Sequence, residues 1–230
     1  MPSLLAATLD LVLPRCCIGC AVAAEALCPR CRAAVLAPRA RRVGALTVRG
    51  AARYAGVVQT MLIAYKERGR RDLAGPLSGF LADSVERGPP GVLIQIPIRR
   101  AARRERGGDP LARLVRRAGW LSGRPVLPAL RLIRPVRDSV GLSAAERAQN
   151  LASAMRAAPP PSPGTPCLVV DDILTTGATL LEARRALLTA GWSVRGGAVV
   201  AFVPRASEVE ASSADLLLQR YGNCQASEIA

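Results

Sequence analysis

The stretch from residue 168 to residue 179, LVVDDILTTGAT, decides how this chain can fold. Apolar residues lead into two adjacent carboxylates, Asp171 and Asp172, and a run of threonines and glycine then opens a segment with helical character over 179–190. In open α/β sheets, ligands bind at the carboxyl ends of strands. Backbone N–H groups at a helix N-terminus, together with the helix dipole, bind anions. The pattern therefore predicts a buried strand followed by a phosphate-binding loop.

The two carboxylates before that loop can accept hydrogen bonds from a diol. A ribose 5-phosphate supplies both partners, because its phosphate and its two hydroxyls lie about one sugar ring apart. Gly177 allows a close approach of the backbone. The alternative is an acidic turn and an N-capped helix with no ligand.

The complete string resembles the signature with which type I phosphoribosyltransferases bind 5-phosphoribosyl-1-pyrophosphate (PRPP). The resemblance implies that Asp171 and Asp172 bind the ribose hydroxyls and assist catalysis. It also implies a set of residues that holds the 5′-phosphate: Thr175, Thr176, Gly177, Ala178 and Thr179. Mg²⁺ is the expected cofactor, since it bridges phosphate oxygens while it keeps most of its waters.

The remaining patterns predict a parallel sheet with helices on its faces. Expected strands cover 43–48, 92–98, 167–170 and 194–203. Expected helices cover 54–65, 72–86 and 110–120, a fourth lies within 143–156, and a fifth covers 179–190. Asp109 is the predicted N-cap of the third helix, and Ser143 with Glu146 forms a predicted capping box on the fourth. We expect a linker at Arg39, Arg41 and Arg42, and loops over 99–109 and 157–166.

Two CxxC pairs lie near the N-terminus: Cys17 with Cys20, and Cys28 with Cys31. Two such turns can place four thiolates around one Zn²⁺ in a closed, structural site. The adjacent Cys16 is expected to be a spectator, although a shifted choice of ligands stays open. The alternative is a set of redox-active or simply buried cysteines.

The order of the zinc-type unit and the phosphate loop resembles the ComF proteins, which are amidophosphoribosyltransferase-like. The segments 64–77, 96–114 and 141–151 resemble further parts of that family. By this resemblance Lys66, Arg99, Arg100 and Arg106 contact pyrophosphate, and Arg147 and Asn150 belong to a flexible loop. The chain departs from the family at Gly108 and Asp109, where an aromatic and an Asn are frequent, and at Val140, where Gln is frequent.

Composition limits the chemistry. The 230 residues include no histidine, which excludes His-based triads, bases and metal ligands. The net charge of +15 permits a nucleic-acid partner, but nearly all the positive charge is arginine in an Ala, Gly and Pro-rich chain, as codon bias would also produce. The apolar stretch 4–13 is too short to cross a bilayer, so we expect a cytoplasmic protein without a membrane span.

These observations predict a Cys₄ unit with an N-terminal helix (1–40), a phosphoribosyltransferase-like domain (41–204) and a polar tail (205–230). The expected function is the transfer of phosphoribose from PRPP to an unidentified nitrogen acceptor. The alternative is a non-catalytic protein that binds PRPP, a nucleotide or nucleic acid, with the link to DNA uptake (competence) that the ComF resemblance implies. Assembly into an oligomer stays open. A glutamine amidotransferase is disfavoured, because it needs an N-terminal nucleophile domain.

Overall fold

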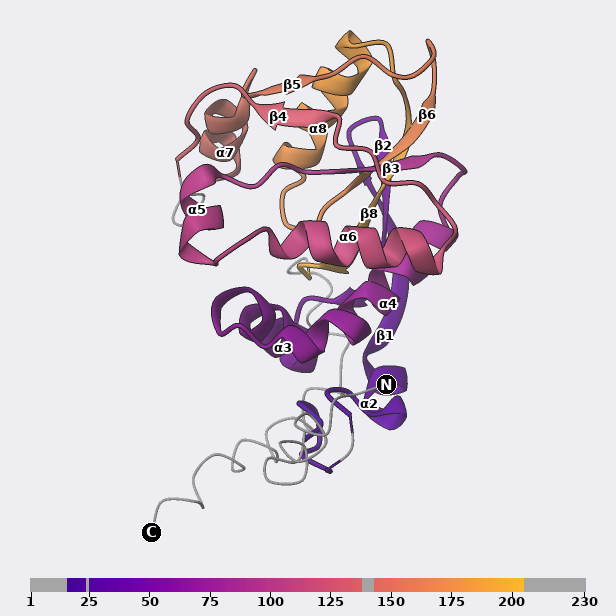
Figure 1. Ribbon diagram of the computed structural model, residues 1–230, viewed down its shortest axis with the longest axis vertical. Coiled ribbons are helices and arrows are strands. Elements are labelled where there is room, and N and C mark those ends of the chain that lie inside the picture. Colours follow the sequence, from indigo (N-terminus) through magenta and orange to yellow (C-terminus); the bar gives the residue numbers. More distant parts are fainter. Residues whose placement is uncertain (1–15, 24, 138–142, 205–230) are drawn as a thin grey trace, which may run out of the picture.

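The computed structural model describes residues 16–23, 25–137 and 143–204. The apolar stretch 4–13, Val140, the tail 205–230 and Cys224 all fall outside those residues. Within them, a central sheet has the strand order β1-β2-β8-β6-β3 (Figure 1). The strands are β1 (Leu36–Val43), β2 (Leu46–Arg53), β3 (Val92–Gln95), β6 (Pro166–Val170) and β8 (Ser193–Phe202). The short β7 (Ile173–Leu174) pairs with the end of β8.

Four neighbouring strands of this sheet, β2, β8, β6 and β3, are parallel, and β1 runs antiparallel to β2 at the edge. The central β8 is buried along its last seven residues, as expected for a strand that is covered on both faces. The edge strand β1 is largely exposed. The carboxyl ends of the parallel strands therefore meet at one edge of the sheet, where a ligand site is expected.

Helices cover both faces of the sheet (Figure 1). α4 (Ala74–Glu86) packs on β2 and β8, and α6 (Pro110–Leu121) packs on α4 and β3. α8 (Ala178–Thr189) packs on β6 and β8, and also on a separate two-stranded ribbon of β4 (Leu130–Leu132) and β5 (Met155–Ala157). Across the sheet, the connection from β2 to β3 runs toward the β3 edge, whereas the connection from β6 to β8 runs back toward β1. Right-handed crossovers therefore place α4 and α8 on opposite faces.

The remaining elements are short or lie at the margins. α3 (Gly56–Glu67) continues through the 3₁₀ turn η1 (Arg71–Leu73) into α4. α2 (Pro29–Val35) follows the cysteine pairs, α5 (Arg100–Glu105) follows β3, and α7 (Ala144–Leu151) precedes β5. None of the described helices is both long and apolar enough to cross a membrane.

The expected fold class is confirmed: a parallel sheet flanked by helices, with a small N-terminal four-cysteine unit. The predicted helix caps are also confirmed. Asp109 accepts a hydrogen bond from the Ala112 N–H. Ser143 and Glu146 form a complete capping box at the start of α7. Such local signals depend on a few consecutive residues, which explains why they can be read from sequence.

Three boundaries were predicted wrongly. The expected linker at 39–42 is part of β1, and the expected strand 43–48 contains the hairpin turn at Gly44 instead. The expected loop 99–109 contains α5. The segment 143–156 does contain the expected helix, α7, which ends at Leu151; Ser153 then has a positive φ of 53° and the chain pairs with β4. Over 39–48 the pairing of β1 with β2 outweighed the local pattern.

Candidate functional site

The loop that the sequence predicts to bind phosphate, here called the phosphate loop, lies between β7 and the first turn of α8. Gly177 has a φ of 84° and is the N-cap of α8, so the preceding threonines stand at the helix N-terminus. A Cβ on Gly177 would overlap the side chain of Val43 in β1. The hydroxyl of Thr176 accepts a hydrogen bond from the Ala178 N–H at 3.4 Å. Glycine is therefore required here both for the left-handed backbone and for the approach of the β1–β2 hairpin.

The two carboxylates follow directly on β6 and are held by their own backbone. The Asp171 N–H donates to the Ala198 carbonyl at 3.1 Å, and the Asp172 carbonyl accepts from the N–H groups of Val200 and Ala201. The Asp172 N–H donates to Asp171 Oδ1 at 2.8 Å. Burial and the neighbouring charge of Asp172 raise the pKa of Asp171 to about 7. At neutral pH Asp171 is therefore protonated in a large share of the molecules.

Lys66, on the last turn of α3, is the cation of this acidic pair. Its Nζ lies 2.6 Å from Oδ2 of Asp172, and the two side chains are only 20% and 16% exposed. Burial opposes the lysine's charge, but Asp172 and Asp171 together raise the pKa of Lys66. The structure thus brings together three residues that the sequence assigned to two separate groups, the ribose site and the pyrophosphate site.

The three arginines that the sequence assigned to pyrophosphate lie in two different places. Arg106 makes two hydrogen bonds to the carboxylate of Glu67, at 2.7 and 3.3 Å, and its charge acts on the neighbouring Lys66. Arg99 is the N-cap residue of α5, and Arg100 is exposed at the first position of that helix. Arg106 is therefore near the acidic pair in this structure.

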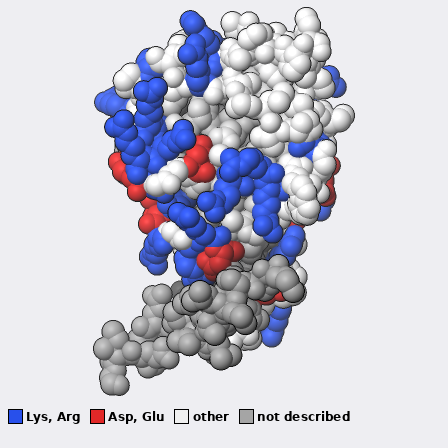
Figure 2. Space-filling model, viewed as in Figure 1, with Lys and Arg blue, Asp and Glu red and all other residues white. Residues whose placement is uncertain are grey.

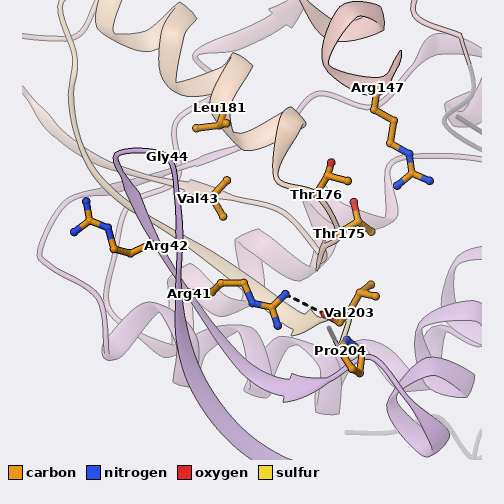
Figure 3. Close-up of a pocket in the computed structure, with 10 residues that line it drawn as sticks. All are labelled: Arg41, Arg42, Val43, Gly44, Arg147, Thr175, Thr176, Leu181, Val203 and Pro204. Carbon is orange, nitrogen blue, oxygen red and sulfur yellow. Dashed lines mark hydrogen bonds between the residues drawn. The ribbon is translucent and has the colours of Figure 1, made fainter. Parts of the chain in front are cut away.

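A cavity of about 800 Å³ opens beside the phosphate loop (Figure 3). Thr175 and Thr176 line one wall, the β1–β2 hairpin lines the opposite wall, and Arg147 reaches in from α7. The hairpin contributes Arg41, Arg42 and Val43. Arg41 is held in place by a 3.0 Å hydrogen bond to the Val203 carbonyl, with its guanidinium 5.0 Å from the centre of the Phe202 ring.

Sequence reasoning did not assign Arg41 or Arg42 to the site, because they were read as a linker. No local signal could have revealed them, since their position depends on the pairing of β1 with β2. Arg147, by contrast, was named from the flexible-loop resemblance, and its Nε is buried with no hydrogen-bond partner in the described part of the chain. Asn150 does not reach the cavity: its amide donates to the Arg137 carbonyl and accepts from the Arg137 N–H, both at 3.0 Å.

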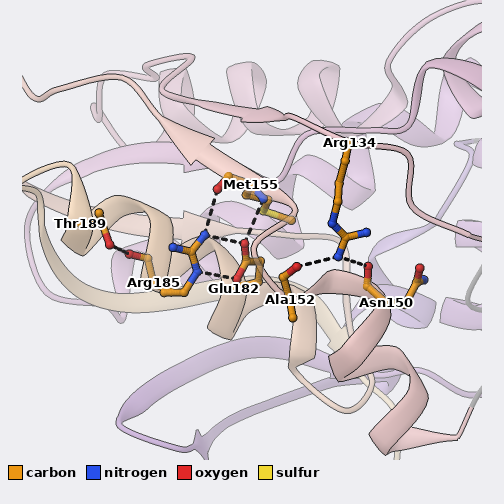
Figure 4. A network of polar contacts seen from close by, with 7 residues as sticks. All are labelled: Arg134, Asn150, Ala152, Met155, Glu182, Arg185 and Thr189. Atoms are coloured by element: carbon orange, nitrogen blue, oxygen red, sulfur yellow. Dashed lines mark hydrogen bonds and ion pairs between the residues drawn. The ribbon is translucent and has the colours of Figure 1, made fainter.

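A polar network centred on the buried Glu182 connects α8 to the β4–β5 ribbon (Figure 4). Glu182 of α8 accepts a hydrogen bond from the Met155 N–H at 2.9 Å and two from the Arg185 guanidinium, both at 2.8 Å. Arg185 also donates to the Met155 carbonyl at 3.0 Å. Nearby, Arg134 donates to the carbonyls of Asn150 and Ala152. These contacts fix α7 and the ribbon relative to the helix that carries the phosphate loop.

The four-cysteine unit brings together all the predicted metal ligands. The sulfurs of Cys17, Cys20, Cys28 and Cys31 all lie within 4.8 Å of one another, and Cys20 and Cys28 are 3.7 Å apart. Four thiolates around one Zn²⁺ at about 2.3 Å would be roughly 3.8 Å apart. Burial opposes ionisation of Cys17, but the N–H groups of Cys28 and Gly19 donate to its sulfur and lower its pKa to about 6. Cys16 is exposed and outside this cluster. The donor set fits Zn²⁺.

Basic side chains gather on one face of the molecule, over α5 and α6 (Figure 2). The arginines come from both helices: Arg100, Arg103 and Arg104 in α5, and Arg113, Arg116 and Arg117 in α6. The high net charge is thus concentrated in part on a surface next to the carboxyl ends of the strands.

The fold and the loop define a class: a parallel α/β protein with a threonine-rich loop at a helix N-terminus and an acidic pair at the carboxyl end of a central strand. No family model matches the chain. Over 101 residues the chain is 39% identical to an orotate phosphoribosyltransferase from Sorangium cellulosum, a match that covers 44% of this chain and 46% of that protein. The chain therefore aligns with less than half the length of this curated relative.

Among solved structures, the chain is similar to an adenine phosphoribosyltransferase from Leishmania tarentolae. The sequence identity is 15%, the TM-score is 0.37, and the match covers 66% of this chain and 68% of that one. The sequence match, together with the fold class, supports a phosphoribosyltransferase-like protein in general terms.

Proposed function

We propose that this protein binds PRPP with Mg²⁺ and transfers its phosphoribosyl group to a nitrogen acceptor, with release of pyrophosphate. The observation that carries the proposal is the position of the acidic pair. Asp171 and Asp172 directly follow a buried parallel strand and directly precede a loop at a helix N-terminus. A diol-binding group and a phosphate-binding group are thereby set a short distance apart, as the two ends of a ribose 5-phosphate require.

In the proposed reaction, the bond from C1 of the ribose to the pyrophosphate oxygen breaks while the acceptor nitrogen forms a bond to C1. The electron pair of the broken bond leaves with pyrophosphate, and the acceptor loses a proton. The transition state carries positive charge on the ribose ring, as in other reactions at an anomeric carbon. The carboxylates of Asp171 and Asp172 would stabilise that charge, while Thr175 to Thr179 would hold the 5′-phosphate.

Lys66 and Arg106 are the residues best placed to receive the departing pyrophosphate. Both are charged groups near the acidic pair, and in this structure they form ion pairs with the carboxylates of Asp172 and Glu67. Exchange of these partners for phosphate oxygens would replace one ion pair with another, so little electrostatic energy is lost. Arg99 and Arg100 remain candidates for a more distant contact from the start of α5.

Two metal ions belong to the proposal. Asp171 and Asp172 offer the oxygen ligands that Mg²⁺ prefers. When bound with PRPP, the Mg²⁺ ion would neutralise part of the negative charge of the pyrophosphate. The four cysteines would hold a structural Zn²⁺, which would stabilise an N-terminal unit too small to have a core of its own. The proposed units are residues 1–40, 41–204 and 205–230.

The finer family assignment, to the ComF proteins, is also a proposal and rests on the cysteine pairs followed by the phosphate loop. A second candidate function goes with it: a non-catalytic nucleotide-binding or nucleic-acid-associated protein in DNA uptake. The basic face over α5 and α6 favours this candidate. Phosphates attracted by such a face would bind with a steep dependence on salt. A cytoplasmic location is proposed in both cases.

Calorimetric titration of PRPP with Mg²⁺ tests the proposal, in the wild type and in an Asp171→Ala/Asp172→Ala variant. Binding to the wild type alone, followed by pyrophosphate release with one of a panel of bases, would support the enzyme. Tight binding without turnover would favour the non-catalytic candidate. A folded, zinc-loaded wild type that does not bind PRPP would refute the central claim.

A further inference from the structure

A cationic side chain from another helix borders the phosphate loop. Arg147 of α7 lines the same cavity as Thr175 and Thr176, and Figure 3 shows its side chain extending from α7 toward these two threonines. The loop itself has no charged side chain and offers only hydroxyls and backbone N–H groups. A guanidinium at its border would add the positive charge that favours a phosphate dianion.

The Nε of Arg147 indicates that this side chain is built to meet a ligand. The atom is buried, and no acceptor contacts it within the described part of the chain. A buried N–H group without a partner is unfavourable, so native structures seldom keep one unless water, an ion or a ligand supplies the acceptor. The acidic neighbour on the same helix, Glu146, is engaged in the capping box, where its Oε2 accepts from the Ser143 N–H at 2.7 Å. The missing acceptor is therefore expected to arrive with a ligand.

The helix that carries Arg147 is held at its carboxyl end. Arg134 donates two hydrogen bonds to backbone carbonyls there, at 2.9 and 2.6 Å. The strand that follows, β5, is tied to α8 by Glu182, which accepts from the Met155 N–H at 2.9 Å (Figure 4). Glu182 lies on the helix whose N-terminus carries the phosphate loop. The same contacts therefore fix the position of Arg147 relative to that loop.

Arg147 also lies apart from the residues expected to receive pyrophosphate. Lys66 pairs with Asp172, and Arg106 pairs with Glu67. None of these four residues is among those that line the cavity of Arg147. In PRPP the 5′-phosphate and the pyrophosphate are attached on opposite sides of the ribose ring. A cation beside the threonines is therefore placed for the 5′-phosphate and not for the leaving group.

We propose that Arg147 binds the 5′-phosphate and so makes the site selective for ribose that carries this phosphate. The proposal rests on the proposed function of the loop as a 5′-phosphate site. In this arrangement the Nε and one terminal nitrogen of the guanidinium donate to two phosphate oxygens, and the loop contacts the others. The resemblance to the ComF proteins places Arg147 in a flexible loop and assigns it no ligand.

Calorimetry on the full chain compares two probes, ribose 5-phosphate and pyrophosphate with Mg²⁺. Arg147→Gln should weaken ribose 5-phosphate binding at least about tenfold, because two charge-assisted hydrogen bonds are lost, and should change the pyrophosphate affinity less than about twofold. The affinity for ribose without phosphate should be the same in the wild type and in Arg147→Gln. Gln149→Ala is the matched control: Gln149 is exposed on the same helix and does not line the cavity, so both affinities should remain.

The pattern of loss decides the inference. A variant Arg147→Gln that weakens pyrophosphate instead of ribose 5-phosphate would place Arg147 in the pyrophosphate site. Equal weakening of both probes, or the same loss in Gln149→Ala, would show that Arg147 only supports α7. Each of these results would overturn the inference, as would unchanged binding of both probes.

Failure of the proposed function has a different signature, since the wild type would then bind neither probe and would not bind PRPP. If Arg147→Gln does not fold, Arg147→Lys decides the case. It keeps the charge but replaces the planar fork with a single ammonium, so ribose 5-phosphate should still bind at least about threefold more weakly, with pyrophosphate unaffected. Unchanged ribose 5-phosphate affinity in a folded Arg147→Gln variant remains the result that rules the contact out.

Discussion

Lys66 Nζ lies 2.6 Å from Asp172 Oδ2, which joins the last turn of α3 to the loop after β6. Both groups are largely shielded from water, and Asp171 follows the same strand with a raised pKa. The free site therefore contains two adjacent carboxylates whose charge is balanced in part by a single lysine. Any ligand that brings its own cation must compete with Lys66 for Asp172.

The first prediction concerns the strength of this ion pair. Lys66→Met and Asp172→Asn should each destabilise the protein, because each leaves the partner charge partly buried without compensation. A double-mutant cycle from urea unfolding should give a coupling energy of about 1–3 kcal/mol. The Arg70–Asp72 pair, 2.7 Å apart with a 43% exposed arginine, is the control, and its coupling should not exceed about 1 kcal/mol. Equal coupling energies in the two pairs would contradict the prediction that the shielded pair is the stronger one.

The second prediction concerns pH. The folded-state pKa of Asp171 is raised from 3.8 to about 7, so between these values the folded protein keeps a proton that the unfolded chain has released. The free energy of unfolding should therefore decrease as pH rises across this interval, by up to about 1.4 kcal/mol per unit. Asp171→Asn should flatten that slope in urea unfolding series.

Glu146→Gln is the control for this titration. Its exposed carboxyl forms the capping box, and its pKa is lowered by hydrogen bonds to Ser143, so it does not titrate near neutral pH. An unchanged slope in Asp171→Asn would show that another group carries the pH dependence. In the wild type, affinity for PRPP with Mg²⁺ should increase as pH rises toward about 7, since Asp171 becomes a carboxylate.

The third prediction concerns the glycine of the phosphate loop. Gly177→Ala should destabilise the protein by more than about 2 kcal/mol and weaken ribose 5-phosphate binding at least tenfold, because the new Cβ meets Val43 and the φ is 84°. Gly69→Ala is the control: its φ is 66° but nothing lies within 4 Å of a Cβ there. The free energy of unfolding of that variant should fall by only about 1–2 kcal/mol, the cost of a Cβ at a positive φ, and its affinity for ribose 5-phosphate should not change. Thermal unfolding and calorimetry measure both effects.

The fourth prediction concerns the cysteines. The purified protein should contain one Zn²⁺ per chain by elemental analysis, and Cys28→Ser should lose it and lower Tm by at least about 4 °C. Cys16→Ser should keep both the metal and the Tm, because Cys16 is exposed and outside the cluster. Loss of zinc in Cys16→Ser with retention in Cys28→Ser would show that the ligand set is shifted.

The sequence was sufficient for features that depend on consecutive residues. The strand before Asp171, the turn at Gly177, the two CxxC pairs and the caps at Asp109 and Ser143 are each encoded within a few positions. The parallel sheet followed from the alternation of apolar runs with helical segments. These features fix the fold class and the position of the phosphate loop along the chain.

Only the tertiary structure decided which distant groups meet. Lys66 pairs with Asp172, and Arg106 pairs with Glu67, because of how the α3 helix packs against the end of the sheet. Arg41 lies beside Thr175 because β1 is the edge strand of that sheet. A local pattern specifies a residue's secondary structure, because hydrogen bonds and caps act between near neighbours. Electrostatic partners are set instead by the packing of the whole core, whose contacts join residues far apart in sequence. The sequence could therefore name charged candidates for this site, but only the folded chain shows which of them pair.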